Sequence, residues 1–371
     1  MAASSKIRVG IVGASASRGF ASIAHIPALR ALPQFEIAAV CTARQDSAEM
    51  AARHYGVPLA FSDPEKLAQH PDVDLVTVSV KVPDHYRPVM AAIEAGKHVY
   101  CEWPLGRDTD EAVRMLDAAE RRGVRHAVGL QGQMSPAINF ARDLVAEGYV
   151  GRVLTATMIG CAPNWGATID RAYQADRANG ATLMTITGGH QIDALCHCLG
   201  EFRELTAFAV SQRDRIPLEA TGEMVAKTAP DQLVVNGIVG GKNAEGAVVS
   251  FQIRGGMRRG TEFLFEIHGD EGDLTLTATS RASMQRQELT VRRAQGAAKE
   301  LAELPIPEKY RWVPDGLETD SRYNVAQLYA HLADCIRDGK PASPGFDAAV
   351  TRHRLLDAIV QASETGRKQV L

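Results

Sequence analysis

The segment GGHQIDALCH places three polar side chains where they could carry out proton chemistry. On a helix, His190, Asp193 and His197 follow the spacing i, i+3, i+7 and therefore share one face. An imidazole that is oriented by a nearby carboxylate can act as a general acid/base near neutral pH. We predict that His190 transfers a proton with help from Asp193, whereas His197 is more typical of a packed histidine. A third strong ligand is not evident on this face, so no metal site is predicted.

Lys81, in the segment VSVKVPDHY, is the second residue that could do chemistry. It follows an expected parallel strand over residues 74–80, at the carboxyl edge where ligands bind in such sheets. A partly desolvated lysine can shift its pKa toward neutrality and exchange protons. We therefore predict that Lys81 assists catalysis. The alternative is an amine that only contacts a cofactor or a surface carboxylate.

The turn GIVGASASRG, after the first expected strand, has the features of a phosphate-binding loop. Gly13 and Gly19 would let the backbone approach a pyrophosphate, and the following helix N-terminus would supply N–H donors. Ser15 and Arg18 add side-chain donors to the same turn. The pattern is not a complete GxGxxG, and an ordinary tight turn is the alternative. Its place after the first strand favours dinucleotide binding.

The second expected strand ends in the sequence AVCTARQDS. Sites that prefer NAD usually carry an acidic residue here for the ribose hydroxyls, whereas arginine suits the 2′-phosphate of NADP. Thr42 and Arg44 therefore favour NADP(H), and the alternative for Arg44 is a solvated side chain. The expected cofactor is NAD(P)(H), with a preference for NADP.

The elements that must position these residues follow two patterns. The first third of the chain alternates short apolar runs with segments of helical periodicity, which predicts strands buried on both faces. These strands are expected over residues 7–13, 35–41, 74–80, 97–102 and 125–130. The alternation predicts right-handed crossovers and an α/β fold with a doubly wound parallel sheet, a Rossmann domain, over residues 1–130.

From residue 131 the pattern changes to strands joined by turns such as GGKNAEG and GDEGD. This predicts a second, α+β domain over residues 131–371 with a large, mainly antiparallel sheet. Two helices are expected near the end of the chain, over residues 320–340 and 347–368.

Composition limits the kinds of partner. The 371 residues include 41 Lys and Arg against 44 Asp and Glu, a net charge of −3 that argues against a general nucleic-acid or membrane-surface role. The six cysteines are scattered without a CxxC pair, as expected in a reducing compartment. An apolar signal region and a run of about 18 apolar residues are both missing from the sequence. We expect a cytoplasmic protein that contacts neither nucleic acid nor membrane.

Four segments in order, VGIVG...HIPAL, VSVKVPDHY, AGKHVYCEWPL and GGHQIDAL, resemble the glucose-fructose oxidoreductase / inositol dehydrogenase (Gfo/Idh/MocA) family over essentially the whole chain. The resemblance implies that the second domain has an open-faced sheet, which buries one face in a homodimer or homotetramer. It also implies hydride transfer between NAD(P)(H) and a secondary alcohol or ketone of a sugar, polyol or related compound. The segments VSVKVPDHY, LQGQMSP and TAPDQL and the lengthened phosphate turn are most similar to the fungal galactose-repressor branch, which binds the dinucleotide but serves as a regulator.

Two positions depart from the family pattern. Family enzymes usually read E-K-P, where the lysine helps to deprotonate the reacting hydroxyl, but this chain reads Glu102-Trp103-Pro104. Tryptophan offers only an N–H donor and cannot act as a base. Aligning ITGGHQID with the family's D-x-x-x-H-x-x-D pattern places Ile186 at the first aspartate. The alternative function is therefore a dinucleotide-binding regulator or sensor with little or no catalysis. A third possible function is redox-neutral chemistry that uses a tightly bound cofactor.

The residues expected around the dinucleotide are Gly13, Ser15, Arg18, Gly19, Thr42, Arg44, Val80, Lys81, His85, Glu102, Trp103, Pro104 and Gln131. The long connection over residues 161–183 leads into the His190 helix, and loops of this length are often functional. Trp165, Arg171 and Tyr173 could bind a carbohydrate-like substrate together with His190, or could only pack the loop against the sheet.

Overall fold

The computed structural model describes residues 6–162, 165, 168–256, 259–278 and 283–371. The chain forms two compact units. The first comprises Met1–Gln131 and Trp312–Thr351, and the second comprises Gly132–Arg311 and Arg352–Leu371. A segment from near the C-terminus thus belongs to the first unit. The functional domain ranges 1–130 and 131–371 stay a prediction.

A six-stranded parallel sheet forms the centre of the first unit, with the strand order β3-β2-β1-β4-β5-β6. The strands are β1 (Ile7–Val12), β2 (Phe35–Cys41), β3 (Leu59–Phe61), β4 (Leu75–Val78), β5 (His98–Cys101) and β6 (His126–Val128). The order reverses between β1 and β4, and ligands of such sheets bind beyond the carboxyl ends of the strands at this point. The expected Rossmann fold is confirmed. Sequence reasoning missed β3, because three residues are too few to show a period.

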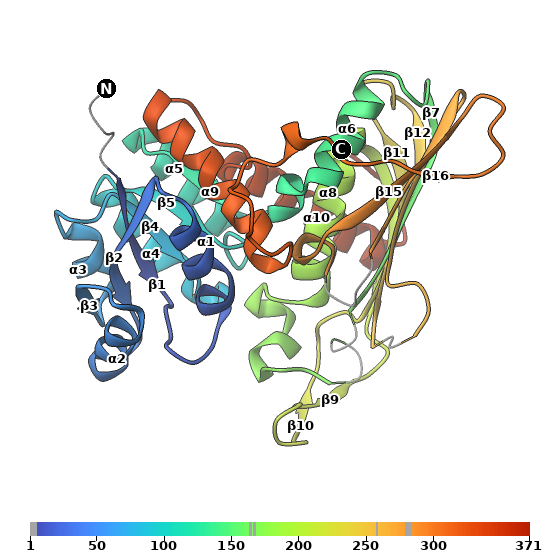
Figure 1. The fold of residues 1–371 in the computed structure, drawn as a ribbon. Helices are drawn as coiled ribbons and strands as arrows, with labels where there is room; N and C mark the ends of the chain where they lie inside the picture. The colour runs from blue at the N-terminus through green and yellow to red at the C-terminus, as the bar shows by residue number, and fades with distance from the viewer. Residues whose placement is uncertain (1–5, 163–164, 166–167, 257–258, 279–282) are drawn as a thin grey trace. The chain divides into compact units, whose positions relative to one another are not determined.

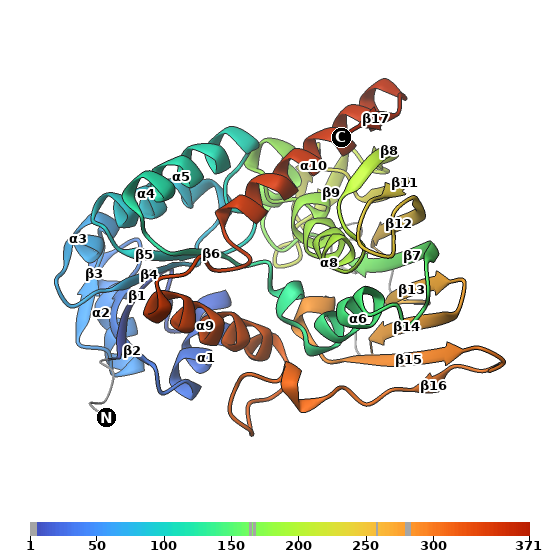
Figure 2. The same ribbon diagram turned by 90° about the horizontal axis from the view of Figure 1, so that it is seen from above.

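Helices flank this sheet on two sides: Figure 2 shows α4 and α5 on one side and α1 and α9 on the other. They are the π-turn η1 (Ala21–His25), α1 (Ile26–Ala31), α2 (Gln45–Tyr55), α3 (Pro64–Gln69), the 3-10 turn η2 (Val82–Asp84), α4 (Tyr86–Glu94), α5 (Thr109–Arg122) and α9 (Ser321–Asp338). Gly56 and Gly123 end α2 and α5 in the left-handed conformation that the sequence predicts. Both η3 (Gln131–Met134) and α10 (Phe346–Thr365) cross the division between the units.

A nine-stranded sheet dominates the second unit, with the order β16-β15-β14-β13-β7-β12-β11-β8-β17. Its strands are β7 (Val153–Ala162), β8 (Phe202–Val210), β11 (Gln232–Val239), β12 (Ala247–Gly255), β13 (Phe263–Gly269), β14 (Gly272–Ala278), β15 (Leu289–Gln295), β16 (Ala302–Glu303) and β17 (Gln369–Val370). Neighbours are antiparallel except for β7 and β12, which pair in parallel. The expected large, mainly antiparallel sheet is confirmed. A short hairpin of β9 (Arg215–Pro217) and β10 (Met224–Ala226) stands apart from it and was not expected.

Two helices of the second unit, α6 (Pro136–Ala146) and α8 (Gly189–Leu199), lie over one face of this sheet (Figure 1). The π-turn η6 (Leu183–Gly188) leads directly into α8, and the 3-10 turns are η4 (Ala172–Ala175), η5 (Arg177–Asn179), η7 (Met284–Arg286) and η8 (Glu308–Tyr310). A Cβ atom at Gly160 of β7 would overlap the side chain of Gln191 in α8. The absence of a side chain at Gly160 therefore lets α8 pack directly on the sheet. Phe208 and Val248 are exposed side chains of the sheet.

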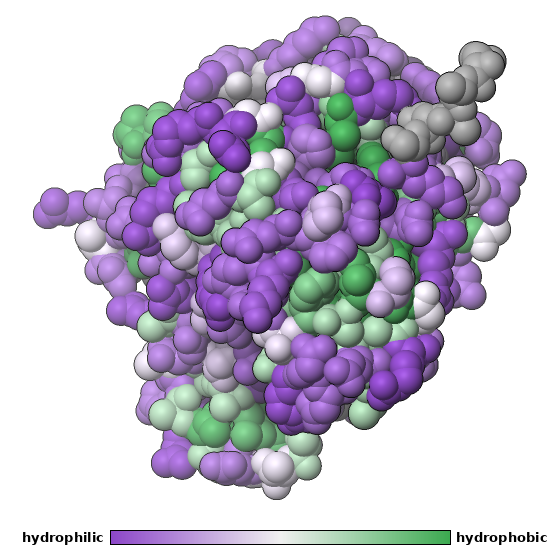
Figure 3. Space-filling model, turned by 90° about the vertical axis from the view of Figure 1, so that its left-hand side faces the viewer, coloured by the Kyte–Doolittle hydropathy of each residue, from purple (hydrophilic) through white to green (hydrophobic). Residues whose placement is uncertain are grey.

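The surface is mostly polar where Figure 3 shows it: hydrophilic residues predominate and hydrophobic ones form separate groups. Within the described part of the chain, the helices are all too short or too polar to cross a membrane.

Candidate cofactor site and active-site residues

Gly13 sits in the turn after β1 and is held close to the neighbouring strands. Its φ of +102° is one that L side chains rarely adopt, and a Cβ atom there would overlap the carbonyl oxygen of Ser79. The Gly13 N–H donates to the Cys41 carbonyl over 2.9 Å. The Tyr55 hydroxyl donates to the Ser15 carbonyl over 2.6 Å. The turn is thus fixed, and only glycine fits at its first position.

A cavity of about 510 Å³ opens at the carboxyl ends of β1, β2 and β4. Its lining includes Gly13, Ser15, Thr42, Val80, Asp84 and Arg87. The strand order of the sheet places the adenosine half and the pyrophosphate of a dinucleotide here. The cavity and the glycine turn fit that group. Four of the predicted cofactor residues, Gly13, Ser15, Thr42 and Val80, therefore lie around one cavity.

The rest of the turn is more open to solvent. Arg18 is exposed, and Gly19 has a φ of +99° with open space where a Cβ atom would point. The Ser22 hydroxyl, within the π-turn η1, donates to the Gly19 carbonyl over 2.8 Å. Both predicted residues thus belong to the turn without lining the cavity described above.

The arginines near this cavity already bind carboxylates. Arg44 is 74% exposed and donates from Nε to Asp46 over 3.0 Å, and this hydrogen bond lowers the pKa of Asp46. Arg87, which sequence reasoning missed, donates to both carboxylate oxygens of Glu65 over 2.7 and 2.6 Å. The Arg87 guanidinium lowers the pKa of Glu65 to about 2. A phosphate would have to compete with these partners.

His85 joins the two loops that follow β4 and β5. Its Nδ1 lies 2.9 Å from the Pro104 carbonyl oxygen and its Nε2 lies 3.3 Å from that of Val80. Burial lowers the pKa of the imidazole, which favours the neutral ring. The predicted residues Val80, His85 and Pro104 are therefore brought together, with His85 as the buried link between the loops.

Lys81 and Trp103 differ in their exposure. Lys81 follows β4 at the carboxyl edge of the sheet, as predicted, and is exposed. Trp103 is only 4% exposed and is joined to Pro104 by a cis peptide bond. The side chain at the position of the family's lysine is therefore a buried indole.

Glu102, at the carboxyl end of β5, lies next to several buried polar side chains. Gln131 Nε2 lies 2.9 Å from each Glu102 oxygen, and His25 Nε2 lies 3.1 Å from Oε1. The Tyr100 hydroxyl is next to this group: burial and the Glu102 carboxylate raise its pKa well above the usual value. Glu102 and Gln131, two predicted cofactor residues, are thus in direct contact.

Three members of this cluster were not predicted: His25, Tyr329 and Thr77. His25 Nδ1 lies 2.8 Å from the Tyr329 hydroxyl, which in turn lies 2.8 Å from the Thr77 hydroxyl. All three side chains are fully buried. His25 stands in the HIPAL segment, which the sequence marks as part of a motif. Tyr329 comes from α9, and its place could not be derived from the distant position in sequence.

His190 lies in the first turn of α8 and is 4% exposed. The preceding π-turn η6 begins with a reciprocal cap: the Thr185 N–H donates to the Thr182 hydroxyl over 3.1 Å, and the Thr182 N–H donates to the Thr185 hydroxyl over 2.8 Å. Ile186 lies inside this turn, so the position of the family's first aspartate is apolar. Turns of the π type occur frequently at functional sites.

Asp193 takes part in a buried polar cluster of the second unit. Gln133 Nε2 donates to both Asp193 oxygens over 3.1 Å, and Arg352 Nε donates to Oδ1 over 3.2 Å. Arg352 also donates to Glu201 over 3.0 and 2.8 Å. Burial raises the pKa of Asp193 to about 6, against the opposing effects of Arg352 and Gln133. Its contacts are those of a residue that holds α8 in place.

His197 packs against α6, as the sequence favours. Its Nε2 lies 3.2 Å from Asn139 Oδ1 and 3.1 Å from Arg142 Nη1. Burial and the Arg142 charge lower the pKa of His197 to about 4. The ring is therefore neutral at physiological pH.

The connection before α8 has a small core of its own. Trp165 packs against a cluster of Ile169, Ala175 and Ile216. Arg171 is exposed, and Tyr173 is partly buried. Residues 163–164 and 166–167 of this connection lie outside the described residues. The packing of Trp165 agrees with the alternative stated above for this loop.

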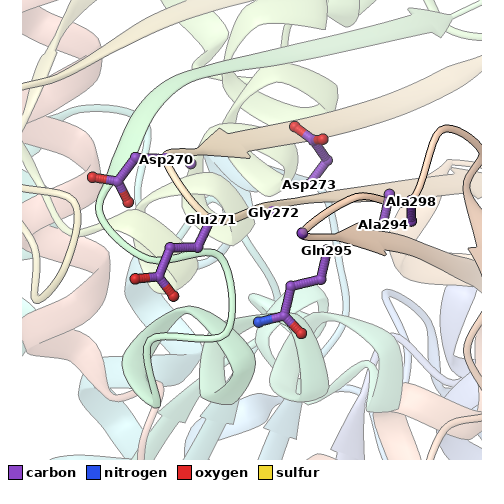
Figure 4. Close-up of a pocket in the computed structure, with 9 residues that line it drawn as sticks. Asp270, Glu271, Gly272, Asp273, Ala294, Gln295 and Ala298 are labelled. Carbon is purple, nitrogen blue, oxygen red and sulfur yellow. The ribbon is translucent and has the colours of Figure 1, made fainter.

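A second cavity, of about 700 Å³, lies at the turn between β13 and β14 and at the end of β15. Figure 4 shows that Asp270, Glu271 and Asp273, which line it, point in different directions. Two of these carboxylates already have partners in the chain. Asp270 accepts a hydrogen bond from the Arg152 backbone N–H over 2.7 Å, and Asp273 Oδ1 lies 2.6 Å from His268 Nδ1. Among the described residues, no three His, Cys, Asp or Glu side chains are grouped so that they could hold a metal ion.

The fold and these residues define a class: a Rossmann dinucleotide-binding unit with a large, mainly antiparallel sheet in the second unit. The family model described as an oxidoreductase family with an NAD-binding Rossmann fold matches residues 7–130. The model of the Gal80p C-terminal domain matches residues 136–278. The chain belongs to the Gfo/Idh/MocA oxidoreductase family, which confirms the resemblance.

Relatives of this chain include both enzymes and regulators. Dehydrogenase aclE of Aspergillus oryzae is 31% identical and covers 98% of each chain. The galactose/lactose metabolism regulatory protein GAL80 of Saccharomyces cerevisiae is 30% identical over 73% of this chain and 66% of its own length. Levoglucosan dehydrogenase of Pseudarthrobacter phenanthrenivorans is 28% identical over 75% of each chain.

Two solved structures share the fold. A super-repressor mutant of Gal80p from Saccharomyces cerevisiae has a TM-score of 0.86 at 25% identity and covers 99% of this chain and 98% of its own. Levoglucosan dehydrogenase in complex with NADH and L-sorbose has a TM-score of 0.84 at 24% identity and covers 99% of each chain.

Proposed function

We propose that this protein is an NAD(P)-dependent dehydrogenase or reductase that acts on a secondary alcohol or ketone of a sugar, polyol or related small molecule. The observation that carries the proposal is the cavity at the ends of β1, β2 and β4, lined by a turn in which only glycine fits at position 13. The curated enzymes aclE and levoglucosan dehydrogenase support redox chemistry over non-catalytic binding.

The first unit would hold the cofactor. Gly13 and Ser15 would contact the pyrophosphate, Thr42 the adenosine ribose, and Glu102 and Gln131 the nicotinamide half. When bound, the cofactor supplies hydride transfer at the nicotinamide C4. The chain must then place the substrate and manage one proton.

His190 is the proposed proton-transfer group. In the oxidation direction the hydride leaves the carbinol carbon for the cofactor, and the hydroxyl proton passes to the His190 imidazole. Lys81 is proposed to assist. Asp193, which binds Gln133 and Arg352, would act by positioning the helix that carries His190. Trp165, Arg171 and Tyr173 remain the candidates for substrate contacts.

The choice between NAD(H) and NADP(H) rests on Thr42 and Arg44, which favour NADP on sequence grounds. Arg44 donates to Asp46 in the structure, so a 2′-phosphate would have to displace that carboxylate. Titration of the purified protein with each cofactor measures the two dissociation constants and so decides which cofactor it prefers.

We also propose a cytoplasmic location and a homodimer or homotetramer that forms through the large sheet. All six cysteines are free, as expected in a reducing compartment. Phe208 and Val248 expose apolar surface on that sheet, which a second copy would cover.

The test is an absorbance assay at about 340 nm for NADH or NADPH, with a panel of sugars, polyols and sugar acids that includes levoglucosan. Turnover is expected for at least one member. The His190→Ala variant should lose most of it, because general acid–base catalysis contributes about 10²–10⁴-fold. An active His190→Ala variant would remove His190 from the mechanism.

A second candidate function is a dinucleotide-binding regulator. It is favoured by the match of residues 136–278 to the Gal80p C-terminal domain and by the buried Trp103 at the position of the family's lysine. A regulator would bind the dinucleotide tightly and turn over no member of the panel. Capture of a protein partner would then be the next experiment.

A further inference from the structure

Glu102 is the one partly exposed member of an otherwise buried chain of polar side chains in the first unit. Its side chain is 13% exposed, whereas His25, Tyr329 and Thr77 are fully buried. Gln131, its other partner, is 2% exposed. The cluster can therefore meet a ligand only through the Glu102 carboxylate.

The directions of the hydrogen bonds follow from the chemistry of the groups. A carboxylate only accepts, so the Gln131 amide donates to Glu102, and His25 Nε2 faces Oε1 at 3.1 Å. On its far side, His25 Nδ1 lies 2.8 Å from the Tyr329 hydroxyl, which lies 2.8 Å from the Thr77 hydroxyl. The two hydrogen bonds from Gln131 and the adjacent His25 ring thus hold the carboxylate in place.

Aromatic rings fix His25 from the sides. The rings of Phe20, Tyr100 and Tyr329 lie 5.5, 5.1 and 5.7 Å from the imidazole, each in an edge-on arrangement. The imidazole is thus held by packing as well as by hydrogen bonds. A buried polar network held by packing in this way favours one geometry.

The position of Glu102 in the sheet indicates what it would meet. It directly follows β5, and Gln131 follows β6. In a sheet of this strand order, one nucleotide half lies over β1, β2 and β3 and the other over β4, β5 and β6. Because the cavity at β1, β2 and β4 suits the adenosine half, the nicotinamide half would lie at the edge that carries Glu102.

We propose that His25 and Gln131 hold Glu102 as a fixed negative charge beside the nicotinamide ring, so that the site binds the oxidised dinucleotide in preference to the reduced one. The nicotinamide ring is cationic only in the oxidised form, and an opposite charge at close range stabilises it. The inference rests on the dinucleotide binding proposed above but not on turnover. Glu102 is then a selectivity residue, and His25 is a positioning residue that acts through it.

The test compares the dissociation constants of NAD⁺ and NADH, measured by calorimetry at one pH, in the wild-type protein and in Glu102→Gln. The variant keeps the size of the side chain and removes its charge. The ratio Kd(NADH)/Kd(NAD⁺) is expected to fall roughly tenfold, since one charge contact in a half-buried site is worth on the order of 1.4 kcal/mol. Lys81 follows β4 on the same edge, and its charge is present in both proteins, so it cancels in the comparison.

ADP-ribose, which lacks the nicotinamide ring, is the matched probe. Its affinity should be the same in both proteins. A ratio that does not change in Glu102→Gln, while ADP-ribose still binds, would overturn the proposal and leave the proposed function standing. If neither ADP-ribose nor NAD⁺ binds the wild-type protein, dinucleotide binding fails and both proposals fall.

The role of His25 is tested by His25→Asn and Tyr329→Phe. Asparagine is too short to reach Glu102, so the ratio should fall part of the way toward that of Glu102→Gln. Removal of the Tyr329 hydroxyl, which touches His25 at Nδ1 and not at the nitrogen that faces Glu102, should change the ratio less. A wild-type ratio in a folded His25→Asn protein would contradict the positioning role. If that variant does not fold, Glu102→Gln with the two dinucleotides still decides the central point.

Discussion

Single residues carry most of the cofactor site, and Gly13 is the one that the backbone constrains most. Substitution by alanine would force a side chain into a φ of +102° and against the Ser79 carbonyl. We expect Gly13→Ala to lower the free energy of unfolding by about 1–3 kcal/mol or more and to abolish NAD binding. Urea denaturation and calorimetry measure the two effects.

Gly19 supplies a matched control for this prediction. It has nearly the same φ, +99°, but open space where the Cβ atom would lie. Gly19→Ala should therefore lower the free energy of unfolding by less than Gly13→Ala does. Equal losses in the two variants would show that backbone strain alone, and not the approach to Ser79, governs the turn.

His197 makes stability depend on pH. Its pKa is about 4 in the folded protein, below the ordinary value of about 6.5, so the unfolded chain binds the proton more tightly. Stability is therefore complete above about pH 6.5 and falls as the pH drops toward 4, by up to about 3 kcal/mol from this residue.

The His197→Gln variant should show a flatter decline of unfolding free energy between pH 7 and pH 4, measured by denaturation at each pH. His54→Gln, at an exposed histidine, is the control and should keep the wild-type slope. A wild-type slope in His197→Gln would refute this origin of the pH dependence.

The residues also differ in how far the sequence could identify them. Gly13, Ser15, Thr42 and Val80 were predicted because their positions follow from strand ends, which apolar runs mark clearly. His25 and Tyr329 could not be predicted as a pair, because their contact joins segments from opposite ends of the chain. No local period or spacing contains that information.

At the scale of elements, the π-turn η6 and helix α8 act together to position His190. The reciprocal bonds of Thr182 and Thr185 fix the start of the turn. Thr182→Ala removes one of them and should cost about 1 kcal/mol of stability. It should also increase amide hydrogen exchange in the first turn of α8.

Thr182→Ser is the control, because serine keeps the hydroxyl that accepts from the Thr185 N–H. Its stability should stay near that of the wild-type protein. If the alanine and serine variants are equally destabilised, the lost methyl group and not the cap is responsible.

The elements themselves were largely predictable. The longer strands of both sheets appeared as apolar runs, and the two final helices as helical periods, whereas the short edge strands β3, β16 and β17 were missed. The parallel pair of β7 and β12 did not follow from the sequence, because alternation of apolar and polar residues is the same in parallel and antiparallel strands. The π-turns were missed because each spans little more than one turn.

At the scale of the whole molecule, the large sheet should determine association between copies of the chain. Phe208 and Val248 are 68% and 51% exposed. We expect Phe208→Glu to shift the protein toward monomers in sedimentation experiments, because the charge would be buried at the contact. Met50→Glu, at an exposed methionine of α2, should leave the oligomer intact. A wild-type protein that is already monomeric would contradict the proposed assembly.

The same scale explains why the first unit could not be outlined from the sequence. Its last part, Trp312–Thr351, follows the whole sheet of the second unit in the chain. Helix α9 within it packs beside α1, as Figures 1 and 2 show, and supplies Tyr329 to the buried cluster. Local patterns identify α9 as a helix but not the unit to which it returns.

The central claim, hydride transfer from a carbinol carbon, is tested most directly with a substrate that carries deuterium at that carbon. The protein is incubated with NAD⁺ and the labelled form of the sugar or polyol that gives turnover, and the cofactor is analysed by mass spectrometry. We expect NADH that is one mass unit heavier, and no labelled NADH from His190→Ala, because that variant loses turnover. Tightly bound NAD⁺ that stays oxidised with every substrate, or NADH without deuterium, would contradict it.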